Sequence, residues 1–397
     1  MPHPLTVTAS AMRAINRSAI LDTIRREGPI SRTAIAHRLG VSLPTVMRIV
    51  DGLVAEGFVR PREDKEWTGG RRRALLEFNT QSQVVVGVDL GGTKMYGALA
   101  DLGGHVLDEV NFGRHGTSGE DSYQLLVSLI DTLLASPKLE NRPVRGIGLG
   151  VPGITLHQEG IVRWAYTLQW RDLPLKARLE ERYGLACTVD NDVNLAALGE
   201  LWYGAGQEAK NMILVAIGTG IGAGIIIDGA LYRGSSEASG EIGGMIPGRE
   251  FLGKDYRDFG ALESVASGTG IAWRARTVAP EAPPATDPAT TDTEVVFEAA
   301  RQGQAWALTL LKETVDYLAL AIGNLMACFD PDVIVLGGGV ARSADLLVEP
   351  ILRRLEGAIP TPPKLVVSAL GPQATVMGAI ANVLHSTTET YVVRRVS

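Results

Sequence analysis

The chain has 397 residues, of which 45% are hydrophobic and 21% are charged, as in an ordinary globular protein. This length is too great for a single core and indicates about two to three domains. No apolar run reaches the roughly 20 residues that span a bilayer, and residues 1–18 lack the apolar core of a signal peptide. The two cysteines, Cys187 and Cys328, exclude a disulfide framework and a multi-cysteine metal site. We therefore expect a cytoplasmic protein with no membrane partner.

The net charge of −6 is distributed unevenly along the chain. Residues 1–79 hold 13 Lys and Arg against 8 Asp and Glu, a net charge of +5, which leaves −11 on the remainder. A small basic segment joined to a large acidic body indicates a module that binds a polyanion. Glycines are numerous, at 46, and we expect them to cluster at turns.

Two short helices are predicted near the N-terminus. Residues 12–26 place isoleucines near one helical face, and Gly28 followed by Pro29 ends this helix. Ser31 is positioned to cap a second helix that runs to about residue 39. The glycine that comes next allows a tight turn into a third helix.

The third helix, residues 43–56, is predicted to recognise DNA. Ser42 can cap it, and Pro44 lies in its first turn, where proline is tolerated. Its apolar positions face inward, which leaves Thr45 and Arg48 more exposed. A short helix, a glycine turn and a second helix that begins with small polar residues are typical of a helix-turn-helix. We expect Ser42, Pro44, Thr45 and Arg48 to contact DNA.

A basic wing is predicted after these helices. Residues 57–60 and 74–78 form two strands around a polar loop that ends in the sequence TGGRRR. Within this loop, Gly70, Arg71 and Arg72 are placed to reach phosphates or a minor groove. A helical dimerisation module with solvated arginines is the alternative. The order of helix-turn-helix and wing favours binding to operator DNA.

The rest of the chain contains strands that end in glycine turns. Residues 84–101 form a strand, an Asp-Leu-Gly-Gly-Thr-Lys turn and a returning strand, and residues 211–229 repeat this pattern. A strand at 146–154 ends in a Pro-Gly turn, and a last strand at 330–341 runs into a glycine loop that opens a helix. Each turn alone fits a plain hairpin, but together they indicate nucleotide binding, because glycines bring backbone N–H groups close to phosphate oxygens. The repeated unit predicts two similar lobes around a cleft.

These motifs, in this order, resemble the ROK family of repressors and sugar kinases. The resemblance covers about residues 12–385 and implies an α/β chain with a two-lobed, actin-like, ribonuclease-H-like sugar-kinase fold. We expect residues 1–80 to form a winged helix-turn-helix DNA-binding domain and residues 81–397 to form the ROK sugar-kinase-like domain. The resemblance also implies a homodimer or homotetramer.

The resemblance implies a nucleotide site on the glycine turns. The residues that match the family's phosphate and adenosine motifs are Asp89, Gly91, Gly92, Thr93, Lys94, Gly218, Thr219, Gly220, Gly338 and Gly339. ATP with magnesium is the expected cofactor if kinase activity is retained.

The resemblance also implies a sugar site, formed by Gly153, Asn191, Asp192, Glu241 and Glu263. Asp192 matches the family's general base, and a carboxylate suits this catalytic role because it accepts the proton of the attacking sugar hydroxyl. Asn191 would hold a neighbouring hydroxyl. Taken alone, Asp-Asn-Asp in a loop is more often a turn or a helix cap.

Two departures from the family pattern concern zinc. Gly244 stands where the family has a histidine that binds both zinc and sugar, and residues 249–263 contain none of the cysteines of the family's zinc motif. We therefore expect no zinc and no metal ligands here. Packing of Phe251, Tyr256 and Phe259 is expected to hold this loop instead. Loss of the histidine is expected to alter the choice of sugar.

Residues 278–292, which are rich in proline, alanine and threonine, are predicted to form a mobile surface loop. Taken together, the complete N-terminal module and the altered sugar site favour a sugar-responsive transcriptional regulator whose effector is a monosaccharide or a sugar derivative. An active or bifunctional ATP-dependent sugar kinase is the alternative, because the phosphate turns and Asp192 are present.

Overall fold

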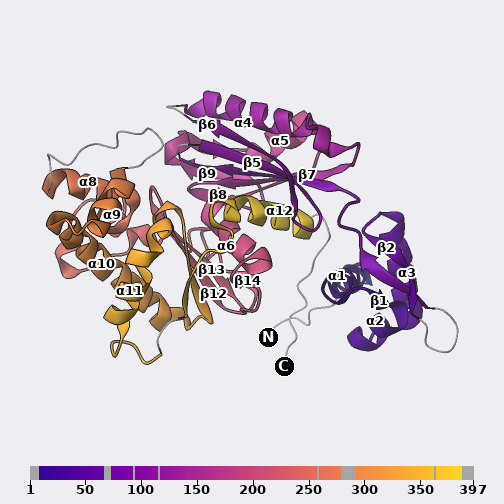
Figure 1. Ribbon diagram of the computed structural model, residues 1–397. Coiled ribbons are helices and arrows are strands. Elements are labelled where there is room, and N and C mark those ends of the chain that lie inside the picture. The colour runs from indigo at the N-terminus through magenta and orange to yellow at the C-terminus, as the bar shows by residue number, and fades with distance from the viewer. Residues whose placement is uncertain are drawn as a thin grey trace, which may run out of the picture.

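The computed structural model describes residues 9–66, 73–92, 94–114, 117–256, 259–278, 292–361 and 364–386. Within these ranges the chain forms a small N-terminal module beside a larger two-lobed body (Figure 1). Most of the predicted loop at 278–292 lies outside the described residues. None of the described helices is long and apolar enough to cross a membrane.

The N-terminal module folds as a winged helix. Its elements are α1 (Ala9–Glu27), β1 (Ile30–Ser31), α2 (Arg32–Leu39), α3 (Leu43–Ala55), β2 (Val59–Glu66) and β3 (Arg73–Phe78). The three strands form one antiparallel sheet in the order β1-β3-β2. The side chain of Ser31 accepts a hydrogen bond from the amide of Ala34 at 3.2 Å, and that of Ser42 accepts one from the amide of Thr45 at 3.4 Å. Both predicted helix caps are therefore confirmed.

The apolar face of α3 packs into the core of the winged helix. Val46, Val50 and Leu53 are fully buried against isoleucines of α1, whereas Met47 and Arg48 are exposed. This is the orientation that the periodicity of the sequence predicted.

The wing strands are longer than predicted. A bulge between Pro61 and Lys65 lets β2 continue its pairing with β3 as far as Glu66. The loop that joins them, with Gly70, Arg71 and Arg72, lies outside the described residues.

The body contains two five-stranded sheets. The first is built from β4 (Val84–Leu90), β5 (Lys94–Asp101), β6 (Val106–Gly113), β7 (Val144–Val151) and β11 (Cys187–Asn191). The second is built from β12 (Met212–Ile217), β13 (Ile221–Ile227), β14 (Ala230–Leu231), β15 (Val333–Gly337) and β16 (Leu365–Val367).

Both sheets have the same strand order and the same directions. The order is β6-β5-β4-β7-β11 in the first sheet and β14-β13-β12-β15-β16 in the second. In each sheet three strands form an antiparallel meander, and two further strands add in parallel beside the first strand of that meander. This repeated topology confirms the predicted two-lobed sugar-kinase fold.

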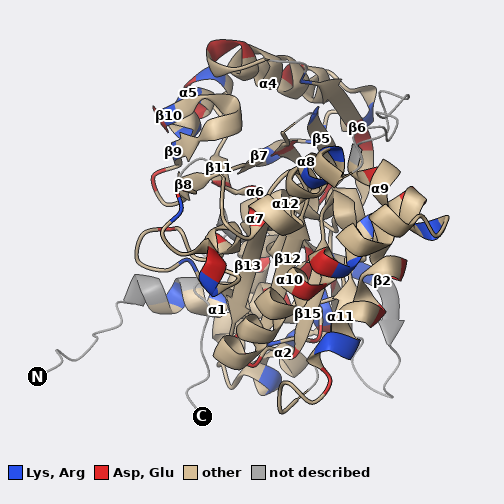
Figure 2. Cartoon of the chain, turned by 90° about the vertical axis from the view of Figure 1, so that its left-hand side faces the viewer, with Lys and Arg blue, Asp and Glu red and all other residues tan. Residues whose placement is uncertain are grey.

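Helices cover both sheets. Their bounds are α4 (Gly119–Leu134), α5 (Leu175–Tyr183), α6 (Asp192–Tyr203), α7 (Glu263–Ala266), α8 (Gly268–Val278), α9 (Asp292–Arg301), α10 (Ala305–Phe329), α11 (Val348–Leu355) and α12 (Ala374–Ser386). α4 and α5 cover the first sheet, while α8 to α11 gather beside the second (Figure 1). Acidic and basic residues mix on the outer helices, as on α11 (Figure 2).

Short elements complete the body. A small antiparallel sheet of the first lobe contains β8 (Ile154–Leu156), β9 (Ile161–Ala165) and β10 (Trp170–Leu173). Single turns of 3-10 helix include η2 (Tyr166–Leu168), η3 (Ile242–Gly244) and η4 (Arg249–Phe251), and a longer one is η5 (Gly339–Leu346).

The helix α12 packs between the first sheet and α6, and glycines make this close approach feasible. A Cβ on Gly148 of β7 would collide with the carbonyl group of Ala379, and one on Gly199 of α6 would collide with the carbonyl oxygen of Ala374. The expectation that glycines cluster at turns is therefore only partly right. These glycines lie inside a strand and a helix, where the absence of a side chain lets two backbones touch.

Candidate functional site

The glycine turns of the two lobes face each other. Gly91 and Gly92 join β4 to β5, and Thr219 lies in the turn between β12 and β13. A Cβ on Gly92 would lie only 3.5 Å from Oγ1 of Thr219. Lys94 begins β5 and is exposed, whereas Thr93 lies outside the described residues. The structure thus brings together two turns that are far apart in the sequence.

The third glycine turn reaches the same place. Gly338 follows β15 with a φ of +82°, and a Cβ there would collide with the carbonyl group of Ile217 at the end of β12. A Cβ on Gly339 would meet no other atom within 4 Å. The helix that this loop opens is the 3-10 helix η5. Open space beside Gly339 and the close approach at Gly338 suit a site that a nucleotide enters.

Three carboxyl groups near these turns have raised pKa values, and Asp192 contributes to the shifts of the other two. Burial and the neighbouring Asp192 raise the pKa of Asp89 to about 7, although Lys94 acts in the opposite direction. Burial raises the pKa of Asp192 to about 6, and backbone hydrogen bonds oppose this shift. Desolvation, with Asp192 and Glu263 nearby, raises the pKa of Glu241 to about 6. Carboxyl groups with raised pKa values are typical of sites that exchange protons or bind hydroxyl groups.

The side chain of Asn191 connects the loop of Gly153 to the start of α6. Its Nδ2 donates to the carbonyl oxygen of Gly153 at 2.9 Å, and its Oδ1 accepts from the amide of Asn194 at 2.9 Å. Asn191 therefore caps α6 as well as holding the loop of Gly153. Asp192 is the first residue of α6, and its Oδ1 accepts from the amide of Val193 at 2.9 Å.

The carboxylate of Glu263 holds the turn of the second lobe. It accepts hydrogen bonds from the amides of Ile221 at 2.7 Å and Gly260 at 3.1 Å. Side chains at Gly220 and Gly243 would collide with it, which explains the glycine at both positions. Its predicted contact with a sugar stays a prediction.

A buried ion-pair network beside the site was missed by sequence reasoning. Asp190 is 1% exposed and receives two hydrogen bonds from Arg233, at 2.8 Å and 2.6 Å. Arg233 also lies 3.7 Å from Glu237, which in turn lies 3.0 Å from Nδ1 of His157. The network joins β11 and the loop after β8 to the segment after β14, and so connects the two lobes. The signal in the sequence was a charged residue, Asp190, at the end of a buried strand.

The loop that replaces the family's zinc motif is held by aromatic packing. Phe251 packs edge-on against Tyr317 with ring centroids 5.7 Å apart, and lies 6.1 Å from Tyr256. The predicted roles of Phe251 and Tyr256 are confirmed. Tyr317 comes from α10, and no pattern in the sequence indicates this contact. Phe259 is partly buried.

Gly244, which stands at the position of the histidine in the family pattern, has space beside it. A Cβ on Gly244 would meet no other atom within 4 Å. Over the described ranges, no group of three or more His, Cys, Asp or Glu side chains is arranged to hold a metal ion.

The predicted DNA-contacting residues of α3 lie at its N-terminal end. Ser42, Pro44 and Arg48 are exposed, and Thr45 is half-buried. The hydroxyl groups of Ser42 and Thr45 lie 2.8 Å apart, so Thr45 is partly engaged in capping the helix. Arg48 is therefore the freer of the two to reach a base edge.

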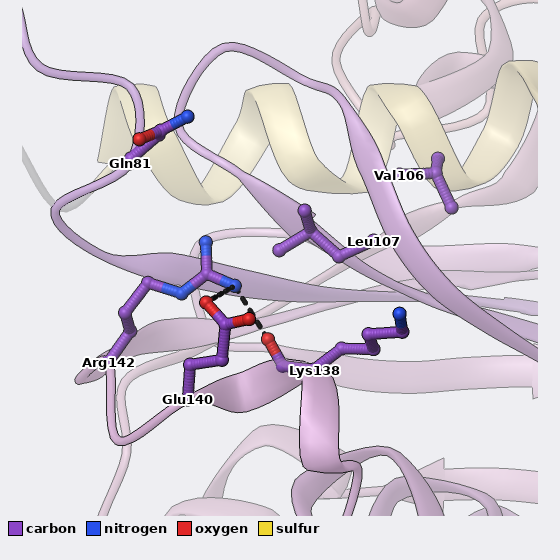
Figure 3. Close-up of a pocket in the computed structure, with 6 residues that line it drawn as sticks. All are labelled: Gln81, Val106, Leu107, Lys138, Glu140 and Arg142. Atoms are coloured by element: carbon purple, nitrogen blue, oxygen red, sulfur yellow. Dashed lines mark hydrogen bonds and ion pairs between the residues drawn. The ribbon is translucent and has the colours of Figure 1, made fainter.

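A hollow of about 440 Å³ lies at the edge of the first lobe, away from the glycine turns (Figure 3). Its lining residues are Gln81, Val106, Leu107, Lys138, Glu140 and Arg142. Arg142 lies 3.6 Å from Glu140 and donates to the carbonyl oxygen of Lys138 at 2.6 Å. Arg142 and Glu140 of this hollow pair with each other, and the hollow does not belong to the candidate site.

A winged helix in front of two matching lobes, whose glycine turns and carboxyl groups converge, defines a transcriptional regulator built on a sugar-kinase-like body. Residues 85–386 match the ROK family, and residues 13–60 match a family of winged helix-turn-helix DNA-binding domains. The chain belongs to the ROK family.

Known relatives include both regulators and kinases. A putative xylose repressor from Caldicellulosiruptor sp. strain Rt8B.4 is 31% identical and aligns over 94% of this chain and 96% of its own. A glucokinase from Halalkalibacterium halodurans is 37% identical and aligns over 74% of this chain and 92% of its own. The crystal structure of a ROK family transcriptional regulator, a homologue of the E. coli MLC protein, superposes with a TM-score of 0.83 at 25% identity, over 95% of this chain and 97% of the other.

Proposed function

We propose that this protein is a sugar-responsive repressor, whose winged helix binds operator DNA and whose body binds a monosaccharide or a sugar derivative. The observation that carries this proposal is the presence in one chain of a complete winged helix and a sugar-kinase-like body with carboxyl groups at its glycine turns. The putative xylose repressor supports it, because the similarity extends over both parts of the chain.

Sugar hydroxyl groups would bind the side chains of Asp192 and Glu241 and the loop of Gly153. Binding between the lobes favours their closed arrangement, because the ligand contacts both lobes only when they approach each other. Two winged helices of a homodimer would bind the two halves of a palindromic operator, and closure would change their spacing.

The glycine turns also fit ATP. Gly91, Gly92, Thr219 and Gly339 would hold its phosphates, and Asp89 would supply a carboxylate oxygen to the magnesium ion. ATP supplies the phosphoryl group when bound.

The proposal is tested by measuring how sugars change DNA affinity. The DNA probe is a duplex that the wild-type protein selects from a random pool, and the sugars are D-xylose and D-glucose. We expect one sugar to lower affinity for the selected duplex by about 5-fold or more, within the usual range of allosteric coupling. Equal affinity for selected and random DNA, or no effect of any sugar in a wider panel, contradicts the proposal.

Residual kinase activity is the alternative that Asp192 favours. Its carboxylate lies beside Asp89 and the phosphate turns, where it can accept the proton of a sugar hydroxyl. The missing histidine loosens sugar positioning, and a small misplacement costs about 100-fold in rate. We therefore expect weak ADP release with the sugar panel, and none from Asp192→Asn, since an amide cannot take the proton. Robust turnover that Asp192→Asn abolishes would make the protein a kinase.

A further inference from the structure

Two elements run from the candidate sugar site to the winged helix. α6 begins at Asp192 and ends at Tyr203, a length of about 18 Å at 1.5 Å per residue. β7 ends at Val151, two residues before Gly153, and its other end begins at Val144. Each element therefore has one end at the sugar site, and its other end lies against the winged helix.

The C-terminal end of α6 contacts α1. The guanidinium carbon of Arg25 lies 4.4 Å from the ring centroid of Trp202. Arg25 is also fixed within its own helix by Asp22, at 2.9 Å. Burial raises the pKa of the neighbouring Tyr203 hydroxyl, and the nearby charge of Arg25 acts in the opposite direction. The attraction between an arginine and a tryptophan ring depends on how the guanidinium group is oriented over the ring.

The first residues of β7 also contact the winged helix, through a second pair of a cation and an aromatic ring. The guanidinium carbon of Arg145 lies 5.0 Å from the ring centroid of Phe58, and that of Arg17 lies 5.9 Å from the same ring. Phe58 is 2% exposed and belongs to the winged helix. Here the body supplies the cation and the winged helix supplies the ring. The two stacks together fix the winged helix at two separate points.

The far end of α6 is tied to α12 and to the segment that precedes α12. Glu200 is fully buried and accepts hydrogen bonds from the amides of Ala205 at 2.7 Å and Leu370 at 2.9 Å. The preceding residue, Gly199, packs directly on α12. A helix without a break between Asp192 and Trp202 moves as one body, so a displacement at its first residue appears at its last.

The joint between the winged helix and the body is incompletely filled. A cavity of about 400 Å³ opens beside Arg25 and Tyr203, and its lining also includes Pro29, Phe78 and His105. This space lies directly beside the Arg25–Trp202 stack, where the winged helix meets the body.

We propose that the Arg25–Trp202 and Arg145–Phe58 stacks couple the sugar site to the winged helix, so that sugar binding reorients the DNA-binding surface through α6 and β7. This inference rests on the proposed function, because it requires that a sugar changes DNA affinity. Arg25, Trp202, Arg145 and Phe58 are coupling residues and touch neither the sugar nor the DNA in this scheme.

The test compares Arg25→Gln with Arg26→Gln. Arg26 is the matched control, because it lies next to Arg25 and pairs with the same Asp22 at 2.9 Å, while it is 63% exposed. We measure affinity for the selected duplex with and without the active sugar, and affinity for the sugar alone. Arg25→Gln and Trp202→Leu are expected to reduce the sugar effect on DNA affinity to about 2-fold or less. Sugar affinity should stay within about 2-fold of the wild type, and Arg26→Gln should keep the full sugar effect.

Each outcome separates the inference from the proposed function. If the wild type responds to sugar and both Arg25→Gln and Trp202→Leu respond equally, the inference is wrong and the proposed function stands. If the wild type binds sugar without any change in DNA affinity, the proposed function fails and the inference fails with it. Trp202→Phe, which keeps an aromatic ring, is expected to retain most of the sugar effect. Arg25→Gln changes a side chain that is 29% exposed, so it keeps the test valid if Trp202→Leu does not fold.

Discussion

The carboxyl group of Asp89 shows how strongly position determines the chemistry of one residue. Burial and the neighbouring Asp192 raise its pKa from 3.8 to about 7. The charged form is therefore disfavoured in the folded protein. The protonated carboxyl therefore contributes its whole stabilisation of the folded protein below the ordinary pKa of an aspartate. This contribution is lost as the pH rises through about 7.

Asp89→Asn should consequently stabilise the protein at high pH. We expect the variant to melt about 2 to 4 °C above the wild type at pH 8, and the difference to be smaller at pH 5. The reason is that the amide carries no charge that burial can penalise. Thermal unfolding at the two pH values measures this. Asp228→Asn, an exchange at an exposed turn, is the control and should show no such dependence. A difference that is equal at both pH values contradicts the prediction.

Individual residues also show where sequence reasoning reaches its limit. The positions of Asn191 and Asp192 at the start of α6 were predictable, because a polar group after a buried strand marks a helix cap. The pairing of Asp190 with Arg233 was not, since the two residues lie on different lobes. Only the folded chain brings such groups together.

Among the elements, α3 allows the most direct prediction, which concerns DNA binding. Its exposed Arg48 lies on the face opposite the buried Val46 and Val50, near the end of the helix that Ser42 caps. Arg48→Ala should weaken binding to the selected duplex by about 10-fold or more, because one good base contact is worth about 1 to 3 kcal/mol. Binding to random DNA should change less. Titration of both duplexes measures this, and an equal loss on both would assign Arg48 to phosphate contacts.

The loop around η4 predicts how the protein responds to chelation. Phe251 packs against Tyr317 in this loop, and we expect no zinc there, so EDTA should leave the melting temperature unchanged. Phe251→Ala should destabilise the protein by about 3 to 5 kcal/mol, the usual loss for a buried phenylalanine. Leu252→Ala is the control, because Leu252 is adjacent and 66% exposed. One tightly bound zinc per chain by elemental analysis contradicts this prediction.

At the level of elements, the sequence predicted well where strands and helices occur. It predicted poorly which elements pack against one another. The glycine turns after β4 and β12 follow from short apolar runs that end in glycine. The glycines inside β7 and α6 were misjudged, because only the approach of α12 explains them. The length of the wing was underestimated, because a bulge keeps its strands paired through polar residues.

For the whole molecule, the uneven distribution of charge predicts that DNA affinity depends strongly on the salt concentration. Residues 1–79 carry a net charge of +5, and the remainder carries −11. We expect DNA affinity to fall by about 1,000-fold between 50 and 200 mM salt if about six phosphates are contacted. Affinity for a neutral sugar should change little, because no charge is neutralised on binding. Parallel titrations of DNA and sugar over this range measure both, and a shallow salt dependence for DNA contradicts a binding mode based on phosphate contacts.

The position of α12 has a consequence for how the protein is made. This helix lies near the end of the sequence, yet it covers β4 and β7 of the first lobe. On the ribosome those strands emerge long before the helix that seals them, and their apolar face stays open meanwhile. The winged helix is synthesised before the body, so an interrupted chain carries a DNA-binding module on an unfinished sensor. Such chains expose apolar surface and become substrates for chaperones and proteases. The late arrival of α12 thereby limits the accumulation of repressors that bind DNA and cannot respond to their signal.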